Sequence, residues 1–306
     1  MKSSRKGVFS AVIYAFVFSL AVACPGRAQV ATSQGDVPAL QTQVFDSSPA
    51  TDAGTTDLPA TGDTDSQSTK KTTPQNASPA VESDWHLDIA PYLWFPGVHG
   101  TVGGPRGEAS VHASATDLLS HFRFGLMGLA DLRYKRVLMP VDLMWVRLGD
   151  DTALPGPGLL AISAKVTASA VLLTPKVGYR VVDREKIKID ALTGFRFWHL
   201  GQSLQFNPSL LGLTFSGSQN WVDPLVGGRI LAALSPKASV TIAGDVGGWG
   251  AGSQLDYQIV GLLGYQIKPK WRLMAGYRYL DVNYRSGPVF DIAMSGVTFG
   301  VNIAVK

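Results

Sequence analysis

Cysteine, charge and long apolar runs are all scarce in this chain of 306 residues, and each scarcity narrows the class of protein. The single cysteine, Cys24, excludes a disulfide framework within the chain. Charged residues make up only 16% of the sequence, whereas soluble proteins usually carry about a quarter. No block of Lys and Arg is long enough to indicate nucleic-acid binding. Beyond the N-terminal region, no apolar run is long enough for a transmembrane helix.

The N-terminus carries the features of an export signal. Basic residues at positions 2, 5 and 6 precede an apolar run over 8–23, and small residues within 26–28 fit a cleavage site. This order predicts a secretory signal peptide over residues 1–28. A membrane anchor is the alternative, but the run falls short of the roughly 20 residues that a spanning helix needs. Lipidation of Cys24 also stays open, although Ala21 stands where a lipoprotein signal usually has Leu.

The following segment, residues 29–83, is composed mainly of Ser, Thr, Pro, Ala, Asp and Gln. Phe45 is its only aromatic residue. Such a composition cannot bury enough apolar surface to offset the entropy of ordering the chain. The sequence therefore predicts a disordered, mildly acidic tail over 29–83.

From Trp85 onward, short segments with alternating apolar and polar residues follow one another to the end of the chain. This period of two predicts β-strands, with candidate ranges 85–95, 123–135, 137–148, 165–182, 186–200, 214–234, 237–247, 254–268, 270–284 and 289–305. Within 96–122 we also expect a short extra strand over 107–114 and a helical turn over 116–122, with Thr116 as its N-cap.

The connections between these strands alternate in length. Turns of two or three residues lie at 135–136, 183–185, 235–237 and 268–270, whereas the segments 96–122, 149–164 and 201–213 are long. Alternating short turns and longer loops are typical of outer-membrane barrels. We predict an all-β fold over residues 84–306, a closed antiparallel up-and-down transmembrane β-barrel of about ten strands, within a range of eight to twelve. An even strand number places the N-terminal tail in the periplasm.

The segment "IKIDALTGFRFW" (187–198) shows which residues share each face. One set is apolar, and the other carries Lys188, Asp190 and Arg196 at mid-strand. Arg and Asp dominate the polar set along the chain, as expected for an enclosed network in which guanidinium groups bind carboxylates. The candidate luminal polar network is Asp88, Arg123, Asp131, Arg133, Lys188, Asp190, Arg196, Arg229 and Arg278; the same parity holds for Asp142, Lys176, Arg180, Asp223, Asp245, Asp256 and Arg272.

Two further patterns favour an apolar face that meets lipid. Glycines recur on the polar face, where they leave room in a narrow lumen and permit curvature. Aromatic residues recur near the strand ends of the apolar face, as in the girdles at membrane interfaces. The prolines at 91, 140, 175 and 224 oppose the barrel interpretation, because each removes a donor from the ladder. We expect them at bulges or at the interface levels.

Three stretches carry a resemblance to a known group of proteins. They are "WHLDIAPYLWFPGVHGTVGG" (85–104), "TDLLSHFRFGLMGLADLRYKR" (116–136) and "VGYRVVD" (177–183). Together they resemble small bacterial outer-membrane β-barrel proteins, over roughly residues 84–306. The resemblance implies an outer-membrane location and an up-and-down barrel, and it carries almost no information on activity. Such proteins commonly end in an aromatic residue that assists the barrel assembly machinery, whereas this chain ends in Lys306.

Residues with catalytic or metal-binding chemistry form no convincing constellation. His86 and Asp88 share a strand face, but a polar pair in the barrel wall explains them better than a metal site. The "HAS" of 112–114 superficially resembles the His-x-Ser of a lipid A deacylase barrel, without the accompanying pattern. No nucleotide-binding or serine-hydrolase motif is present in the sequence. We therefore expect no catalytic, cofactor or metal residues.

The lumen remains as the candidate site. A barrel of eight to ten strands is wide enough for its own side chains or one small solute. The leading interpretation is a non-enzymatic barrel with a structural or surface-interaction role and a lumen filled by the Arg/Asp network. The alternatives are a narrow channel for small polar solutes, a lipid-modifying outer-membrane enzyme and a soluble periplasmic barrel with an apolar interior. Expected partners are outer-membrane lipid, lipopolysaccharide and the assembly machinery.

Overall fold

The computed structural model describes residues 84–104, 107–155, 161–207 and 214–305. The predicted signal peptide and tail lie outside this range. The described part contains eleven strands and one short helix, α2 (Ala115–Ser120). The strands are β1 (Trp85–Gly104), β2 (Gly107–Ala113), β3 (Phe122–Tyr134), β4 (Val137–Pro155), β5 (Ala161–Asp183), β6 (Ile187–Asn207), β7 (Thr214–Ala233), β8 (Ala238–Gly248), β9 (Leu255–Lys268), β10 (Trp271–Tyr284) and β11 (Val289–Ala304).

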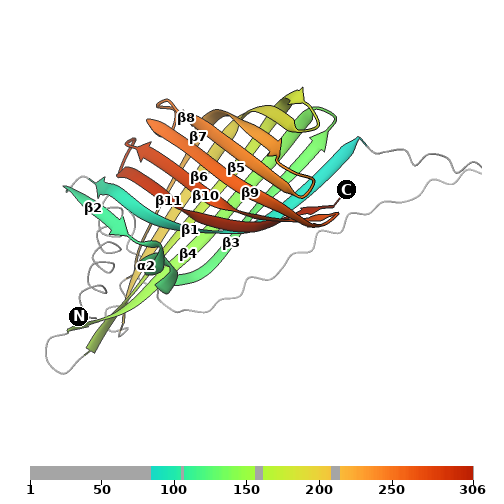
Figure 1. The fold of residues 1–306 in the computed structure, drawn as a ribbon. Coiled ribbons are helices and arrows are strands. Elements are labelled where there is room, and N and C mark those ends of the chain that lie inside the picture. The colour runs from blue at the N-terminus through green and yellow to red at the C-terminus, as the bar shows by residue number, and fades with distance from the viewer. Residues whose placement is uncertain (1–83, 105–106, 156–160, 208–213, 306) are drawn as a thin grey trace, which may run out of the picture. The chain divides into compact units, whose positions relative to one another are not determined.

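Ten of these strands close into an antiparallel barrel (Figure 1). From β3 to β11, each strand pairs with the next one along the chain, and β1 pairs with both β3 and β11 to close the cylinder. The closing ladder runs from Asp88 opposite Ala304 to Gly103 opposite Val289. Among the described strands, the short strand β2 pairs only with the later part of β1. The predictions of a ten-stranded up-and-down barrel and of an extra strand near 107–114 are confirmed.

The two ends of the barrel differ in their connections. Tight turns after β3, β5, β7 and β9 lie at one end, together with the start of β1 and the end of β11; we call it the short-turn end. The carbonyl of Asp84 accepts a hydrogen bond from Lys135 N at 3.2 Å, which ties the start of β1 to the first tight turn. We call the opposite end, with the longer connections, the long-hairpin end. In outer-membrane barrels the short turns face the periplasm.

The strands differ in length around the barrel. β4, β5, β6 and β7 have 19, 23, 21 and 20 residues, whereas β8, β9 and β10 have 11, 14 and 14. The expected loops 149–164 and 201–213 are therefore largely strand within the described residues, with Pro155 opposite Ala161 and Gln205 opposite Thr214. Neighbouring strands in these hairpins pair their backbone donors and acceptors with one another. Strand pairing can therefore continue beyond the length that a bilayer requires.

The short helix begins two residues earlier than expected. Its N-cap is Ser114, whose hydroxyl accepts a hydrogen bond from Asp117 N, while the Asp117 carboxylate accepts one from Ser114 N. This reciprocal capping box satisfies two donors at the helix start. The prediction of Thr116 as N-cap was wrong, because its hydroxyl instead lies 2.8 Å from the Ser114 hydroxyl.

The prolines lie at gaps or ends of the ladders rather than at bulges. Pairing between β4 and β5 lapses at Met139 and Pro140, between the pairs Leu138–Gly178 and Val141–Pro175. The pairing of β5 with β6 lapses at Thr174 and Pro175, between the pairs Leu173–Phe197 and Lys176–Gly194. Pro224 directly precedes the first pair of the β7–β8 ladder. Bulges occur elsewhere, between Arg180 and Val182 for example. The barrel thus accommodates a missing donor by a local gap in pairing.

Glycine is required on the luminal face where neighbouring strands approach closely. A Cβ added at Gly276 would lie 1.9 Å from the carbonyl oxygen of Gly261, and one at Gly227 would lie 2.2 Å from that of Gly244. Any side chain at these two positions would therefore push the strands apart. This explains the recurrent glycines that the sequence places on the polar face.

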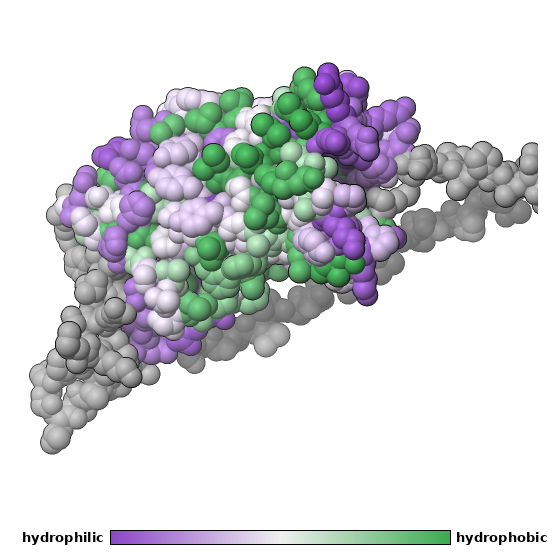
Figure 2. All heavy atoms as spheres, viewed as in Figure 1, coloured by the Kyte–Doolittle hydropathy of each residue, from purple (hydrophilic) through white to green (hydrophobic). Residues whose placement is uncertain are grey.

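The orientation of the strands agrees with the prediction. In β6, Ile187 and Phe195 are 46% and 45% exposed, whereas Asp190 and Arg196 are 1% and 0% exposed. Around the barrel, large apolar side chains lie outside and charged side chains lie inside, which is the reverse of the arrangement in a soluble protein. Figure 2 shows hydrophobic residues across the middle of the visible face and hydrophilic residues toward its ends. An apolar band flanked by polar rims is the surface that a bilayer accommodates.

Among the described residues, no helix is long and apolar enough to cross a membrane.

Candidate functional site in the barrel lumen

The first group of luminal charges lies toward the short-turn end and joins four strands. Arg180 on β5 binds Asp190 on β6 through Nε and Nη2, at 2.8 and 3.3 Å. Arg229 on β7 binds the same carboxylate at 3.0 Å and reaches across to Asp131 on β3 at 2.5 Å. The alternation of two guanidinium groups and two carboxylates gives each charge an opposite partner.

The second group lies deeper and is centred on Arg278 of β10. Its guanidinium donates to the Tyr92 hydroxyl at 2.8 Å, to Asp142 Oδ2 at 3.0 Å and to Gln258 Oε1. Tyr92 in turn donates to Asp142 Oδ1 at 2.7 Å. The guanidinium also lies over the ring of Trp94, with 5.0 Å between Cζ and the ring centroid. Because Tyr92 and Asp142 belong to β1 and β4, this cluster crosses the lumen.

The third group is the most deeply buried and is centred on Arg196. Its guanidinium binds two carboxylates, Asp245 at 2.8 Å and Asp256, and its Nε donates to the Thr174 hydroxyl at 3.3 Å. Lys176 binds the other oxygen of Asp245 at 2.5 Å. The side chains of Arg196 and Asp256 have no exposed surface. These buried ion pairs and hydrogen bonds join side chains from β5, β6, β8 and β9, and they fix these four strands relative to one another.

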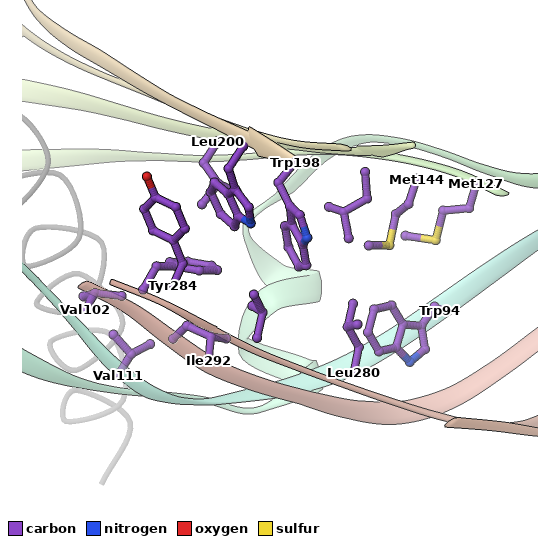
Figure 3. Close-up of a cluster of buried hydrophobic side chains, with 14 residues drawn as sticks. Trp94, Val102, Val111, Met127, Met144, Trp198, Leu200, Leu280, Tyr284 and Ile292 are labelled. Atoms are coloured by element: carbon purple, nitrogen blue, oxygen red, sulfur yellow. The ribbon is translucent and has the colours of Figure 1, made fainter. Parts of the chain in front are cut away.

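Aromatic side chains fill the lumen beyond this charge layer, toward the long-hairpin end (Figure 3). The rings of Trp198 and Trp221 stack at 5.2 Å, and Tyr284 stacks on Trp221 at 4.3 Å. Phe290 packs edge-on against Trp198. Trp198 Nε1 donates to Asp256 at 2.9 Å, which joins the aromatic cluster to the charge layer. We call this apolar filling the luminal plug; its buried members are Trp94, Val102, Val111, Met127, Met144, Leu172, Trp198, Leu200, Trp221, Leu280, Val282, Tyr284, Phe290 and Ile292.

The luminal plug was not predicted from the sequence, although a signal for it exists. Trp198 lies two residues after Arg196, and Trp221 lies two residues before Asp223, so both have luminal parity. The expectation of a polar lumen was based on the charged members of that set alone. Strand parity predicts which side chains point inward, but it does not require them to be polar.

A cavity of about 550 Å³ occupies the lumen on the short-turn side of the Arg278 cluster. Its lining begins at the exposed turn residues Pro236, Pro269 and Lys270, and it extends inward to Gln258 and Arg278. The cavity therefore opens at the short-turn end and is closed on its inner side by the second and third charge groups. Its size falls in the usual range of small-molecule sites.

The predicted network residues divide between these groups and other places. Asp131, Asp190, Arg196, Arg229 and Arg278 belong to the bonded groups described above.

The other four predicted residues do not join these groups. Arg123 pairs with Asp151 on the exposed rim at 2.7 Å and takes no part in the luminal contacts. Asp88, Arg133 and Lys188 line the cavity near the short turns, and no carboxylate–cation pair within 4.0 Å involves any of them among the described residues.

The two side chains of interest for enzymatic chemistry, Ser114 and His112, have the following contacts. The Ser114 hydroxyl caps α2 and lies 2.6 Å from the Asp117 carboxylate. His112 on β2 is opposite His99 on β1, with 6.4 Å between their ring centroids. Within the described ranges, no three His, Cys, Asp or Glu side chains are grouped as metal ligands would be.

Comparisons with known proteins give similarity of fold. No protein-family model and no curated protein sequence matches the chain. Among solved structures, the outer membrane protease OmpT from Escherichia coli matches with a TM-score of 0.48 and 9% identity, over 74% of this chain and 99% of that one. The translocator domain of the autotransporter NalP from Neisseria meningitidis matches with a TM-score of 0.40 and 13% identity, over 74% and 90%. The toluene transporter TbuX from Ralstonia pickettii matches with a TM-score of 0.30 and 10% identity, over 73% and 90%.

These three proteins differ in function, and no role is transferred from them to this chain. The class of the protein follows from its own geometry. A closed antiparallel barrel leaves no unpaired strand edge, and its outward apolar side chains and buried charges fit a hydrocarbon environment. The protein is a bacterial outer-membrane β-barrel.

Proposed function

We propose that this outer-membrane barrel has a non-enzymatic, structural or surface-interaction role and does not conduct solutes. The observation that supports this proposal is the filled outer half of the lumen. The Arg196 ion pairs and the stacked rings of Trp198 and Trp221 occupy successive levels of this part of the lumen. A solute would have to break dry ion pairs and unstack aromatic rings to pass, and both steps are costly.

The long strands supply a surface for interaction. A strand crosses a bilayer with about 9–11 residues, so β4 to β7, with 19 to 23 residues, extend well past the membrane on one side of the barrel. The outer segments of β6 and β7 are rich in Ser, Gln and Gly, as in "GQSLQ" (201–205) and "SGSQN" (216–220). Gln205, Ser216, Ser218 and Asn220 are exposed there, so this hairpin presents uncharged hydrogen-bonding groups. We propose outer-membrane lipid, lipopolysaccharide and the assembly machinery as partners of the barrel.

A narrow channel for small polar solutes is the second candidate. The cavity of about 550 Å³ favours it, because half of the lumen is already open to solvent. The remaining alternatives have less support. The Ser114 hydroxyl caps a helix, as a structural residue would, and a soluble barrel with an apolar interior does not fit the exposed apolar face.

Conductance across a planar bilayer tests the proposal. Wild-type protein, whose folding is verified by a gel-mobility shift on boiling, should give no current steps above a detergent blank. The Arg285→Ala variant, which alters an exposed rim pair with Asp291, should also be silent. Stepwise currents from the wild type that change in size on Arg278→Ala would overturn the proposal and support the channel.

A further inference from the structure

We infer that the cavity at the short-turn end is a binding site for a small organic anion that carries a phosphate or carboxylate group. This goes beyond the structural role, because it assigns a ligand to the half of the lumen that the luminal plug leaves open. We call this half the vestibule. It is defined by the residues that line the cavity, from Pro269 at its mouth to Arg278 at its inner end.

Cations outnumber carboxylates in the lining of the vestibule. The lining contains eight cationic side chains, Arg133, Lys176, Arg180, Lys188, Arg229, Lys270, Arg272 and Arg278, and three carboxylates, Asp88, Asp131 and Asp142. Three further carboxylates, Asp183, Asp190 and Asp245, do not line the cavity but bind lining cations. The balance remains positive after all six carboxylates are counted.

The excess charge is concentrated near the mouth. Among the described residues, Lys176, Arg180, Arg229 and Arg278 each bind a carboxylate. The other four lining cations, Arg133, Lys188, Lys270 and Arg272, have no carboxylate within 4.0 Å in the described part of the chain. Paired charges thus close the inner side of the vestibule, and cations without a carboxylate surround its entrance.

Three of these cations lie at one level of the barrel. Arg133 is the second-last residue of β3, and Lys188 and Arg272 are the second residues of β6 and β10. Lys188 is close enough to interact electrostatically with Arg133, Arg180 and Arg272. Like charges gathered in a partly buried place repel one another, and a bound anion would remove that cost.

Acidic groups face the same level and must be included in the charge balance. Asp88 interacts with Arg272 and Arg133 as well as with Asp131. Asp183 is 3.9 Å from Arg180 and interacts with Lys188. Two carboxylates among Arg133, Arg180, Lys188 and Arg272 leave part of the positive potential uncompensated, so the mouth attracts an anion of one or two charges.

The rest of the lining indicates an organic anion rather than an inorganic ion alone. Apolar side chains alternate with the polar ones, among them Leu129, Leu231, Leu262 and Met274. A volume of about 550 Å³ exceeds what a single phosphate fills. Small-molecule sites typically combine an apolar wall with a few polar anchors. A phosphate or carboxylate at the cations, with an apolar body against these side chains, would use both parts of the vestibule.

Calorimetric titration of the folded barrel in non-ionic detergent tests the inference, with phenyl phosphate as the probe and phenol as its uncharged counterpart. We expect phenyl phosphate to bind and phenol to bind much more weakly. The double variant Lys188→Gln/Arg272→Gln should weaken phenyl phosphate binding by at least about tenfold, because it removes two charge-assisted contacts. Lys188→Arg, which retains the charge, should bind as the wild type does. Asp88→Asn should strengthen binding by about threefold, because a competing negative charge is lost.

The matched control changes two cations outside the vestibule. Lys237→Gln/Lys268→Gln alters exposed turn residues by the same chemistry, and it should leave the affinity unchanged. Absence of phenyl phosphate binding, or an equal loss in the turn and vestibule variants, would overturn the inference. A gel-mobility shift on boiling verifies that each variant is folded.

A second arm separates a free anion from a lipid headgroup. The barrel is titrated in phosphatidylcholine vesicles with and without phosphatidylglycerol. Equal affinity for phenyl phosphate in both supports a soluble ligand. Competition by phosphatidylglycerol that disappears in the vestibule variant supports the anion site and identifies its source as lipid. Competition that disappears only in the turn variant places the anion on the exterior and overturns the inference.

Discussion

The two halves of the lumen are built from the same strands with the same alternation of side chains, yet one half is filled and the other is hollow. Toward the long-hairpin end, the rings of Trp198 and Trp221 stack on each other, and Arg196 forms ion pairs with two carboxylates. Toward the short-turn end, Lys188 and Arg272 line a cavity and have no carboxylate partner within 4.0 Å among the described residues. Strand geometry fixes which residues point inward, and charge balance and side-chain volume decide whether the space closes.

The difference predicts opposite responses to the removal of charge. In the filled half, each cation compensates buried carboxylates, so its loss leaves them unpaired in a dry environment. In the hollow half, the cations without a carboxylate partner, such as Lys188, repel their cationic neighbours, so the loss of one relieves repulsion. Three substitutions test this contrast.

The largest effect is expected for Arg196→Ala. Asp245 keeps Lys176, but Asp256 loses its guanidinium partner while fully buried. We expect a loss of about 5 kcal/mol in the free energy of unfolding, at the upper end of the range for a broken buried pair. Urea titration in lipid vesicles, read as the folded band on unboiled gels, measures it. The same change on the exposed rim, Arg285→Ala, should cost at most about 1 kcal/mol. Equal losses in the two variants would remove the distinction between buried and exposed pairs.

A smaller effect is expected for Trp221→Ala in the luminal plug. The substitution removes a ring that stacks between Trp198 and Tyr284, and it leaves a cavity in a close-packed core. We expect a loss of about 3 kcal/mol, measured in the same urea titration. Trp249→Ala removes an exposed tryptophan at the same end of the barrel and serves as the control, with little expected change. A loss for Trp249→Ala as large as that for Trp221→Ala would show that the plug does not contribute to stability.

The smallest effect is expected for Lys188→Gln in the vestibule. The substitution relieves repulsion with Arg133, Arg180 and Arg272, at the expense of the attraction to Asp183. We expect the free energy of unfolding to stay the same or to rise by less than about 1 kcal/mol. A destabilisation comparable to that of Arg196→Ala would show that Lys188 belongs to a bonded network and would blur the contrast between the two halves.

Much of the fold could be predicted from the sequence. The period of two fixed the strands, and the tight turns after Tyr134 and Asp183 fixed their order and direction. The dominance of Arg and Asp on the polar face indicated the orientation, because guanidinium–carboxylate pairing suits an enclosed network. The lengths of β4, β5 and β6 were underestimated, since residues 149–164 and 201–213 lack the apolar alternation that marks a lipid-facing strand. Backbone pairing alone extends these hairpins.

The partners of individual charges could not be predicted. Parity assigns Arg123 and Arg196 to the same luminal set, yet Arg123 pairs with Asp151 on the rim and Arg196 is buried. Depth along the barrel depends on the stagger between strands that are distant in sequence, such as β6 and β9, and no local pattern encodes that stagger. For the same reason, the separation of the lumen into a plug and a vestibule emerges only from the assembled barrel.

The assignment to the outer membrane depends most on the outward orientation of the apolar side chains. In a chain with Cys24 replaced by Ser, spin labels at Phe195→Cys and Lys188→Cys can be compared for contact with oxygen, which dissolves in lipid, and with a water-soluble nickel complex. The label at 195 should respond to oxygen and not to nickel, whereas the label at 188 should respond to nickel. A label at 195 that meets nickel and is shielded from oxygen would contradict the outward-facing apolar wall.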